Sequence, residues 1–151
     1  MGTSVESTGE PADILLVEDN PGDVRLTEEA LDEGKVDVNL SVVSDGEEAL
    51  DFLHQRGDHA DAPRPDIVLL DLNLPGKNGE DVLEEINEDE MLSRIPVIVL
   101  TSSAAEEDIV RTYDLRANAY LTKPIDPDEF VEAVRAFEAF WLRIVHLPPE
   151  S

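Results

Sequence analysis

Polar side chains follow four short apolar runs in this 151-residue sequence. They are Glu18 and Asp19 after residues 14–17, Asp71 after 67–70, Thr101 after 97–100, and Lys123 after 119–122. An unbroken apolar run between turn residues predicts a strand that is buried on both faces of a parallel sheet. The carboxyl ends of such strands meet at one edge, where open α/β sheets bind their ligands. We therefore expect these side chains to share one pocket.

The chemistry of this set is that of an anion site built around a metal ion. A carboxylate at the end of a core strand is costly to bury without a partner, and clustered carboxylates repel one another. A cation between them removes the repulsion, and an all-oxygen ligand set suits Mg²⁺. The ammonium of Lys123 and the hydroxyl of Thr101 would then meet an incoming anion. These groups favour the transfer of a phosphoryl group to Asp71.

The elements that must position these residues alternate along the chain. Strands are expected at residues 13–17, 36–43, 67–70, 96–100 and 119–122, the second of them at a sheet edge. Helix starts are marked by Asn20-Pro21, Asp45 with Glu48, Ser103 with Glu106, and Asp126-Pro127, and a further helix follows Gly79. The order predicts an α/β fold with helices on both faces of a doubly wound, five-stranded parallel sheet.

The last helix is expected to run from Pro127 to about residue 145, roughly 30 Å. Its apolar stripe comprises Phe130, Val134, Phe137, Trp141 and Ile144, widened by Ala133, Ala136 and Phe140. One sheet face cannot cover an arc this wide, so we expect a homodimer interface around Phe137, Phe140 and Trp141. A core helix that ends in a loose tail is the alternative.

Composition restricts the class of protein. Acidic residues number 36 against 11 basic ones, for a formal net charge of −25, so we expect no binding to nucleic acid or to anionic membranes. With 41% hydrophobic residues the chain has a real core, and we interpret the charge as a sign of a halophilic host rather than of disorder.

The sequence has no cysteine and no apolar stretch of membrane-spanning length, which favours the cytoplasm. We expect a flexible tail at residues 1–12, one domain at 13–146 and a tail at 147–151, with no room for a second domain. His54 and His59 are interpreted as solvated. In the turn at 75–79, Gly76 and Gly79 are expected to permit positive φ.

The set Glu18-Asp19, Asp71, Thr101 and Lys123-Pro124 resembles the receiver domain of two-component response regulators, over residues 13 to 141. The segments 17–23 and 140–142 are most similar to stand-alone regulators that are paired with bacterial phytochrome kinases. These four short motifs occur in order, each at a strand end, and together they make the resemblance specific. It implies the strand order 2-1-3-4-5, which places Asp19 beside Asp71.

The resemblance also implies roles. Asp71 would accept a phosphoryl group from a histidine kinase or a phosphotransfer protein. Mg²⁺ would be held by Asp19, Asp71 and the main-chain carbonyl of Asn73, with Glu18 acting through a bound water. Lys123 would pair with Asp71 at rest and with the phosphoryl oxygens afterwards.

Phosphorylation would draw the hydroxyl of Thr101 inward and let Tyr120 rotate into the vacated space. The surface formed by the helix expected from Ser103, the strand at 119–122 and the helix from Pro127 would then change, while the protein remains a signalling domain rather than an enzyme. The Lys123-Pro124 bond is cis in members of the family.

Plainer roles stay open for several of these residues. Glu18-Asp19 could cap a helix, Thr101 could cap the next one, Tyr120 could be core and Lys123 could be a surface residue. A pseudo-receiver that only binds partners is the main rival function. An aspartyl-nucleophile phosphatase would need an acid at position 73, and a flavin-binding module would need a phosphate loop where Glu18-Asp19-Asn20 stands.

Overall fold

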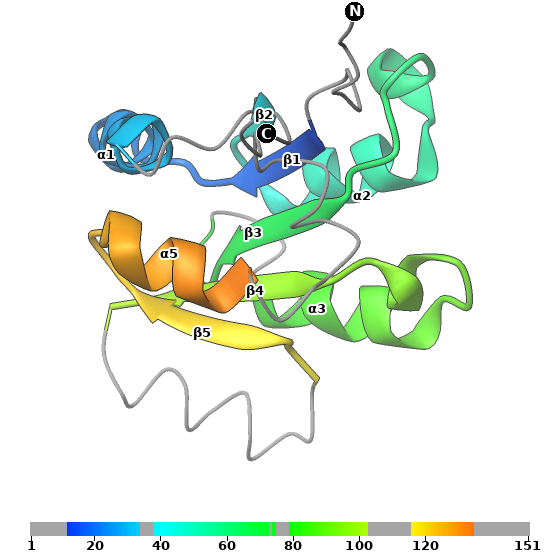
Figure 1. Cartoon of the computed structure of the whole chain (residues 1–151). Coiled ribbons are helices and arrows are strands. Elements are labelled where there is room, and N and C mark those ends of the chain that lie inside the picture. Colours follow the sequence, from blue (N-terminus) through cyan, green and yellow to red (C-terminus); the bar gives the residue numbers. More distant parts are fainter. Residues whose placement is uncertain (1–11, 34–37, 73, 75–78, 103–115, 135–151) are drawn as a thin grey trace, which may run out of the picture.

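The computed structural model of the protein describes residues 12–33, 38–72, 74, 79–102 and 116–134. Within them, five parallel strands form one sheet in the order β2-β1-β3-β4-β5 (Figure 1). The strands are β1 (Ala12–Val17), β2 (Val38–Val43), β3 (Ile67–Asp71), β4 (Val97–Thr101) and β5 (Ala119–Thr122). The helices are α1 (Pro21–Glu33), α2 (Gly46–His54), α3 (Gly79–Glu88) and α5 (Pro127–Val134), with short 3-10 turns at η2 (Gly57–His59) and η3 (Leu92–Arg94). The predicted doubly wound sheet is confirmed.

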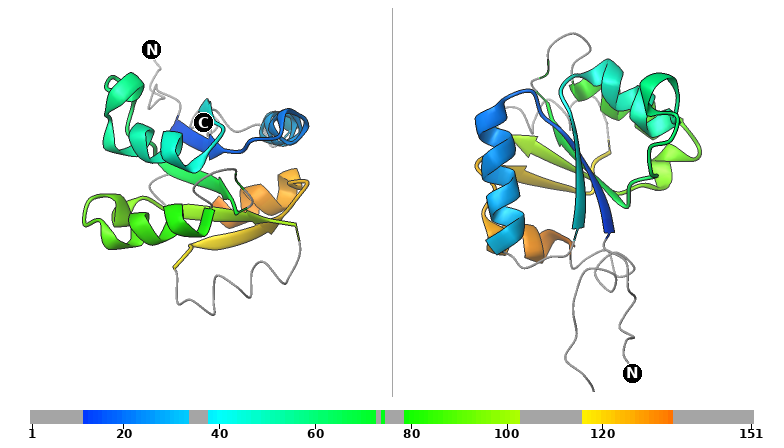
Figure 2. Two further views of the ribbon diagram at one scale, coloured as in Figure 1. Left: turned by 180° about the vertical axis from the view of Figure 1, so that it is seen from behind. Right: turned by 90° about the horizontal axis from the view of Figure 1, so that it is seen from above.

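Helices cover both faces of the sheet. In Figures 1 and 2, α1 and α5 lie together on one face, and α2 and α3 lie together on the other. All residues of β3 are buried, and they alternate between the two cores: Ile67 and Leu69 pack under α1 and α5, Val68 and Leu70 under α2 and α3. Each such side chain contributes about 1.5–3 kcal/mol when buried, so both faces fix the register of this strand.

The predicted caps of three helices are confirmed. Asn20, Asp45 and Asp126 each accept a hydrogen bond from a backbone N–H in the first turn of α1, α2 and α5 respectively. The donors, in that order, are Asp23 at 3.1 Å, Glu48 at 2.8 Å and Asp128 at 2.7 Å. Because these caps follow the carboxyl ends of the strands or their loops, they set where each helix starts relative to that edge.

The strand β2 lies at the edge of the sheet, as predicted, and its side chains are unevenly covered. Val38 and Leu40 pack against the core under α1 and α5, but Val42, on the same side, is 41% exposed. Val43 is buried in the opposite core instead. Because β2 has a neighbouring strand on one side only, the sheet does not fully cover its end. This explains why Val42 is exposed.

The two histidines, interpreted as solvated, are only partly exposed and lie beside carboxylates. The Nε2 atom of His59 lies 3.2 Å from a carboxylate oxygen of Glu48, and its ring packs against Phe52 at 5.3 Å between centroids. His54 Nε2 lies 3.9 Å from Glu85 Oε2. About a quarter of each histidine side chain is exposed, 24% for His59 and 25% for His54. The turn η2 folds back over the first turn of α2, an approach that local sequence did not reveal.

Two predicted helical segments lie outside the described residues: the helix expected from Ser103, and the continuation of α5 beyond Val134. The proposed interface residues Phe137, Phe140 and Trp141 are among them. Within the part of the chain that is described, no helix combines the length and the apolar character needed to cross a membrane.

Candidate functional site

The register of the sheet brings the predicted residues to one edge. The last registered pairs there are Val17–Leu70, Asp71–Leu100 and Thr101–Thr122. Beyond the strands, the N–H of Glu18 donates to the carbonyl of Val43 at 2.9 Å, and the N–H of Lys123 donates to the carbonyl of Thr101 at 2.8 Å. These bonds extend the hydrogen-bond ladder of the sheet by one residue, so they fix the backbone of Glu18 and Lys123.

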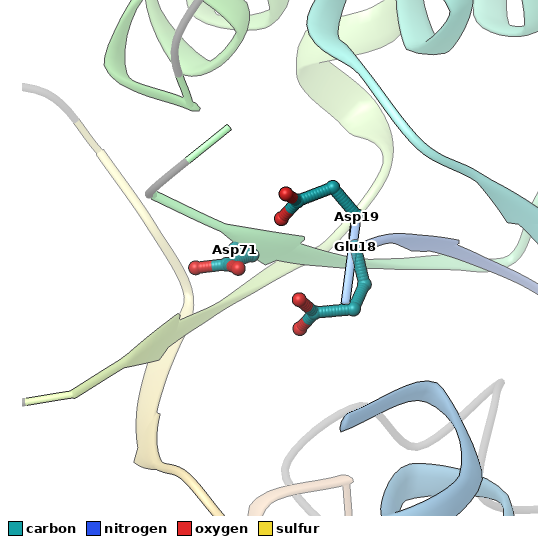
Figure 3. A group of neighbouring side chains, drawn as sticks. All are labelled: Glu18, Asp19 and Asp71. Carbon is teal, nitrogen blue, oxygen red and sulfur yellow. The ribbon is translucent and has the colours of Figure 1, made fainter. Parts of the chain in front are cut away.

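Three carboxylates gather at this edge. One ligand oxygen each from Glu18, Asp19 and Asp71 lie within 4.8 Å of one another, and Figure 3 shows the side chains reaching toward a common space from the ends of β1 and β3. Glu18 and Asp71 are 1% and 2% exposed, whereas Asp19 faces solvent. An ion that binds oxygen at about 2.1 Å holds opposite ligands about 4.2 Å apart, so this all-oxygen set fits a hard divalent cation after a small inward movement.

The ammonium of Lys123 is the cationic centre of the site. Its Nζ atom donates to Asp71 Oδ2 at 3.1 Å, to Glu18 Oε1 at 3.2 Å and to Asp23 Oδ2 at 3.0 Å. Only 14% of the lysine side chain is exposed. Because an ammonium group has three N–H donors, these three ion pairs saturate it.

The electrostatics of the site follow from burial and close charges. Burial, then the charge of Asp71 and a hydrogen bond with it, raise the pKa of Glu18 from 4.5 to about 7, although Lys123 opposes the shift. Burial alone would lower the pKa of Lys123, but its bonds to Asp23 and Asp71 and the charges of Asp71 and Glu18 raise it above its ordinary value. Lys123 therefore stays charged, whereas the site disfavours ionisation of Glu18.

Thr101 and Tyr120 lie on neighbouring strands. Thr101 ends β4 and is 2% exposed. Tyr120 pairs with Val99, two residues before Thr101, and is half-buried against the core under α2 and α3. Alternation along β4 and β5 puts both side chains on that same face of the sheet. Asn73, the expected main-chain ligand, lies outside the described residues.

Sequence reasoning missed Asp23 as a member of this site. Asp23 is the acidic residue in the first turn of α1, and its carboxylate reaches Lys123. The usable signal was position: α1 begins four residues after β1 ends, so its first turn must lie over the edge that carries Glu18 and Asp19.

Gly79 corrects another expectation. It opens α3 without the positive φ that the sequence suggested, and its N–H donates to the carbonyl of Leu72 at 3.1 Å. A Cβ atom at this position would overlap the carbonyl oxygen of Asp71. Glycine is needed here for close approach to the backbone that carries the central carboxylate. The other glycine of this turn, Gly76, lies outside the described residues.

These features define a class of protein. The family model for the response regulator receiver domain matches residues 14–135. The chain therefore belongs to the receiver-domain family of response regulators, as its motifs indicated.

Its relatives include a response regulator that matches this chain over nearly its whole length. Response regulator Rcp1 of Synechocystis sp. is 44% identical over 143 residues, which cover 95% of this chain and 97% of Rcp1. A solved structure of Rcp1 in its Mn²⁺-bound form has a TM-score of 0.71 at 46% identity, covering 91% of this chain and 99% of the other.

Two further structures are similar over most of their length. The bacteriophytochrome response regulator AtBRR has a TM-score of 0.83 at 41% identity, with 93% of this chain and 99% of that chain covered. The phosphorylated cyanobacterial phytochrome response regulator RcpA has a TM-score of 0.71 at 48% identity, with 87% and 94% covered. The protein is thus a receiver domain that resembles phytochrome-associated regulators.

Proposed function

We propose that this protein is a stand-alone response regulator that accepts a phosphoryl group on Asp71 from a histidine kinase or a phosphotransfer protein. The observation that carries the proposal is the 3.1 Å ion pair between Asp71 and Lys123, set beside the carboxylates of Glu18 and Asp19. One edge of the sheet thus holds a buried nucleophile, a cation for the arriving phosphoryl group and a candidate metal site. Similarity to phosphorylated RcpA supports the same role.

In the proposed transfer, a carboxylate oxygen of Asp71 attacks the phosphorus of a phosphohistidine or acyl phosphate. The bond between phosphorus and the donor atom breaks, and its electron pair leaves with the donor. The product is a mixed anhydride of Asp71 and phosphate. Lys123 exchanges its bond to Asp71 for one to a phosphoryl oxygen, which suits a mobile point charge. Later attack by water on phosphorus returns the free carboxylate and inorganic phosphate.

Asp19, Asp71 and the main-chain carbonyl of Asn73 would hold Mg²⁺, with Glu18 acting through a bound water. The ion would neutralise charge on the phosphoryl oxygens and keep Asp71 ionised. The spacing of the carboxylate oxygens, within 4.8 Å, supports this assignment, as does the Mn²⁺-bound form of the relative Rcp1.

Signal output would begin at Thr101. A phosphoryl group on Asp71 brings nearly two negative charges and new acceptor oxygens, which attract the threonine hydroxyl. Tyr120, on the same face one strand away, would then turn inward. The surface formed by the helix expected from Ser103, by β5 and by α5 would change, and a partner would recognise that change.

We further propose that the protein acts in the cytoplasm, binds no nucleic acid and forms a homodimer through Phe137, Phe140 and Trp141. The net charge of −25 supports the exclusion of nucleic acid and is the basis for proposing a halophilic host. Size-exclusion chromatography with light scattering, with and without beryllofluoride, tests the dimer. A monomer in both states would remove that part of the proposal.

The phosphoacceptor role is tested by intact-mass spectrometry after incubation with acetyl phosphate and Mg²⁺. We expect one added phosphoryl group on the wild-type chain, and none on Asp71→Asn or in the presence of EDTA. An unmodified wild-type chain would favour a pseudo-receiver that acts only by binding. Sustained release of phosphate from unrelated phosphomonoesters would instead favour the phosphatase.

A further inference from the structure

The three carboxylates that saturate Lys123 differ in what happens to them during phosphoryl transfer. Asp71 Oδ2 belongs to the residue that would be phosphorylated, and Glu18 belongs to the acidic cluster that would face a metal ion. Asp23, whose Oδ2 atom gives the shortest of the three ion pairs at 3.0 Å, belongs to neither. It is therefore the one partner of Lys123 that remains available throughout the cycle.

Local contacts fix the position of Asp23. It is the third residue of α1, and its N–H donates to the capping side chain of Asn20 at 3.1 Å. A carboxylate in the first turn of a helix is stabilised by the partial positive charge of that end. Helix α1 also packs against α5, which follows the loop that carries Lys123, so the two sides of the ion pair are held by a helix contact (Figure 2). The side chain is half-buried, with 32% exposed.

We propose that Asp23 is a positioning residue that holds the ammonium of Lys123 beside Asp71 while Lys123 moves from the carboxylate to the phosphoryl group. This inference rests on the proposed phosphoacceptor function and adds a residue to it. When Asp71 gains its phosphoryl group, Lys123 loses one acceptor and gains a phosphoryl oxygen, but its bond to Asp23 is unchanged. The ammonium is thus held close to its final position before the transition state, and only its bond to Asp71 has to change.

A second effect of Asp23 has the opposite sign, which makes the proposal testable. Its negative charge lies near an incoming dianion, so removal of that charge by itself would speed phosphorylation. Positioning predicts the reverse: loss of the carboxylate slows both attack on the donor and attack by water on the phosphoryl group, because Lys123 stabilises the phosphoryl oxygens in both steps.

The experiment compares rate constants of phosphorylation by acetyl phosphate and of subsequent hydrolysis, by intact mass, at saturating Mg²⁺. For Asp23→Asn and Asp23→Ala we expect both constants to fall about tenfold. Asp23→Glu, which keeps a carboxylate, should stay within about threefold of the wild type. Glu28→Gln is the matched control, since it removes the same charge from an exposed position on α1, and it should leave both rates unchanged.

Several results would overturn the proposal. Rates in Asp23→Asn equal to or above those of the wild type would mean that Asp23 acts only by repulsion. A fall of more than about a hundredfold in Mg²⁺ affinity, measured by calorimetry, would make it a metal ligand instead. The near-isosteric Asp23→Asn decides the question even if Asp23→Ala fails to fold. A wild-type chain that takes no phosphoryl group would defeat the proposed function itself, which is a separate outcome.

Discussion

The backbone of Gly79, at the start of α3, lies directly against the main chain of Asp71. A Cβ atom at Gly79 would overlap the carbonyl oxygen of Asp71 and lie 2.5 Å from the Cα of Leu72. Since all residues of β3 are buried, the main chain of Asp71 has little room to move away from this contact. The position of the candidate phosphoacceptor therefore depends on a glycine eight residues further along the chain.

Gly79→Ala should destabilise the protein by about 1–3 kcal/mol, the usual cost of overpacking, and slow the phosphorylation of Asp71. Urea denaturation and the acetyl phosphate assay measure the two effects. Gly22→Ala is the control: its Cβ would meet only the side-chain oxygen of Asn20, at 3.1 Å, and no backbone atom. Equal stability of the two variants would contradict the tight contact.

Lys123→Met should destabilise the metal-free protein by about 3 kcal/mol or more. The substitution leaves Glu18 and Asp71, which are 1% and 2% exposed, without their cation. Urea denaturation in EDTA measures this loss. Added Mg²⁺ should restore more stability to the variant than to the wild type, because an ion among the carboxylates takes over the role of the ammonium.

The double variant Lys123→Met with Asp71→Asn separates charge from packing. Removal of one buried carboxylate should recover part of the stability lost in the single variant, through the coupling expected of residues in contact. Additive effects of the two substitutions would show that the 3.1 Å pair has little energetic weight.

Salt should stabilise this protein. With a formal net charge of −25, repulsion between acidic side chains opposes folding, and at about 1 M salt the Debye length is only about 3 Å. We expect the thermal unfolding midpoint to rise between dilute buffer and molar KCl. Sodium sulfate, which also strengthens apolar burial, is a less selective comparison. A midpoint that does not change with KCl would remove the basis for a halophilic host.

The sequence was sufficient for the sheet and for most of the site because both depend on local signals. Apolar runs such as 67–70 and caps such as Asn20 mark the elements, and parallel strands then bring Glu18, Asp71 and Lys123 to one edge. The contacts that the sequence could not reveal are those between segments that are distant along the chain.

Asp23 reaches Lys123 across 100 residues, and Gly79 is needed for contact with the main chain of Asp71 rather than for its own φ. His59 returns to Glu48 across a turn that has no strong local pattern. Each of these contacts requires the relative placement of two elements, which spacing alone does not give.

The pH dependence of stability in the metal-free protein should carry the signature of Glu18. Burial and the nearby charge of Asp71 raise the pKa of this carboxyl from 4.5 to about 7, so the folded state binds its proton more tightly than the unfolded state. The resulting stabilisation is fully present below about pH 4.5 and is lost as the pH rises to about 7. Glu18→Gln lacks this titration, so its stability relative to the wild type should increase across that range and level off above it.

The measurement is urea denaturation of both proteins in EDTA at several pH values. Subtraction of the two curves cancels the contribution of the other acids, and Glu29→Gln, an exposed change on α1, should run parallel to the wild type. With saturating Mg²⁺ the difference should shrink, since a cation beside Glu18 favours its charged form. If the curves for Glu18→Gln and wild type ran parallel between pH 4.5 and 7, ionisation of Glu18 would cost little free energy in the folded state. Lys123 would then stabilise the charge of Glu18 as well as that of Asp71.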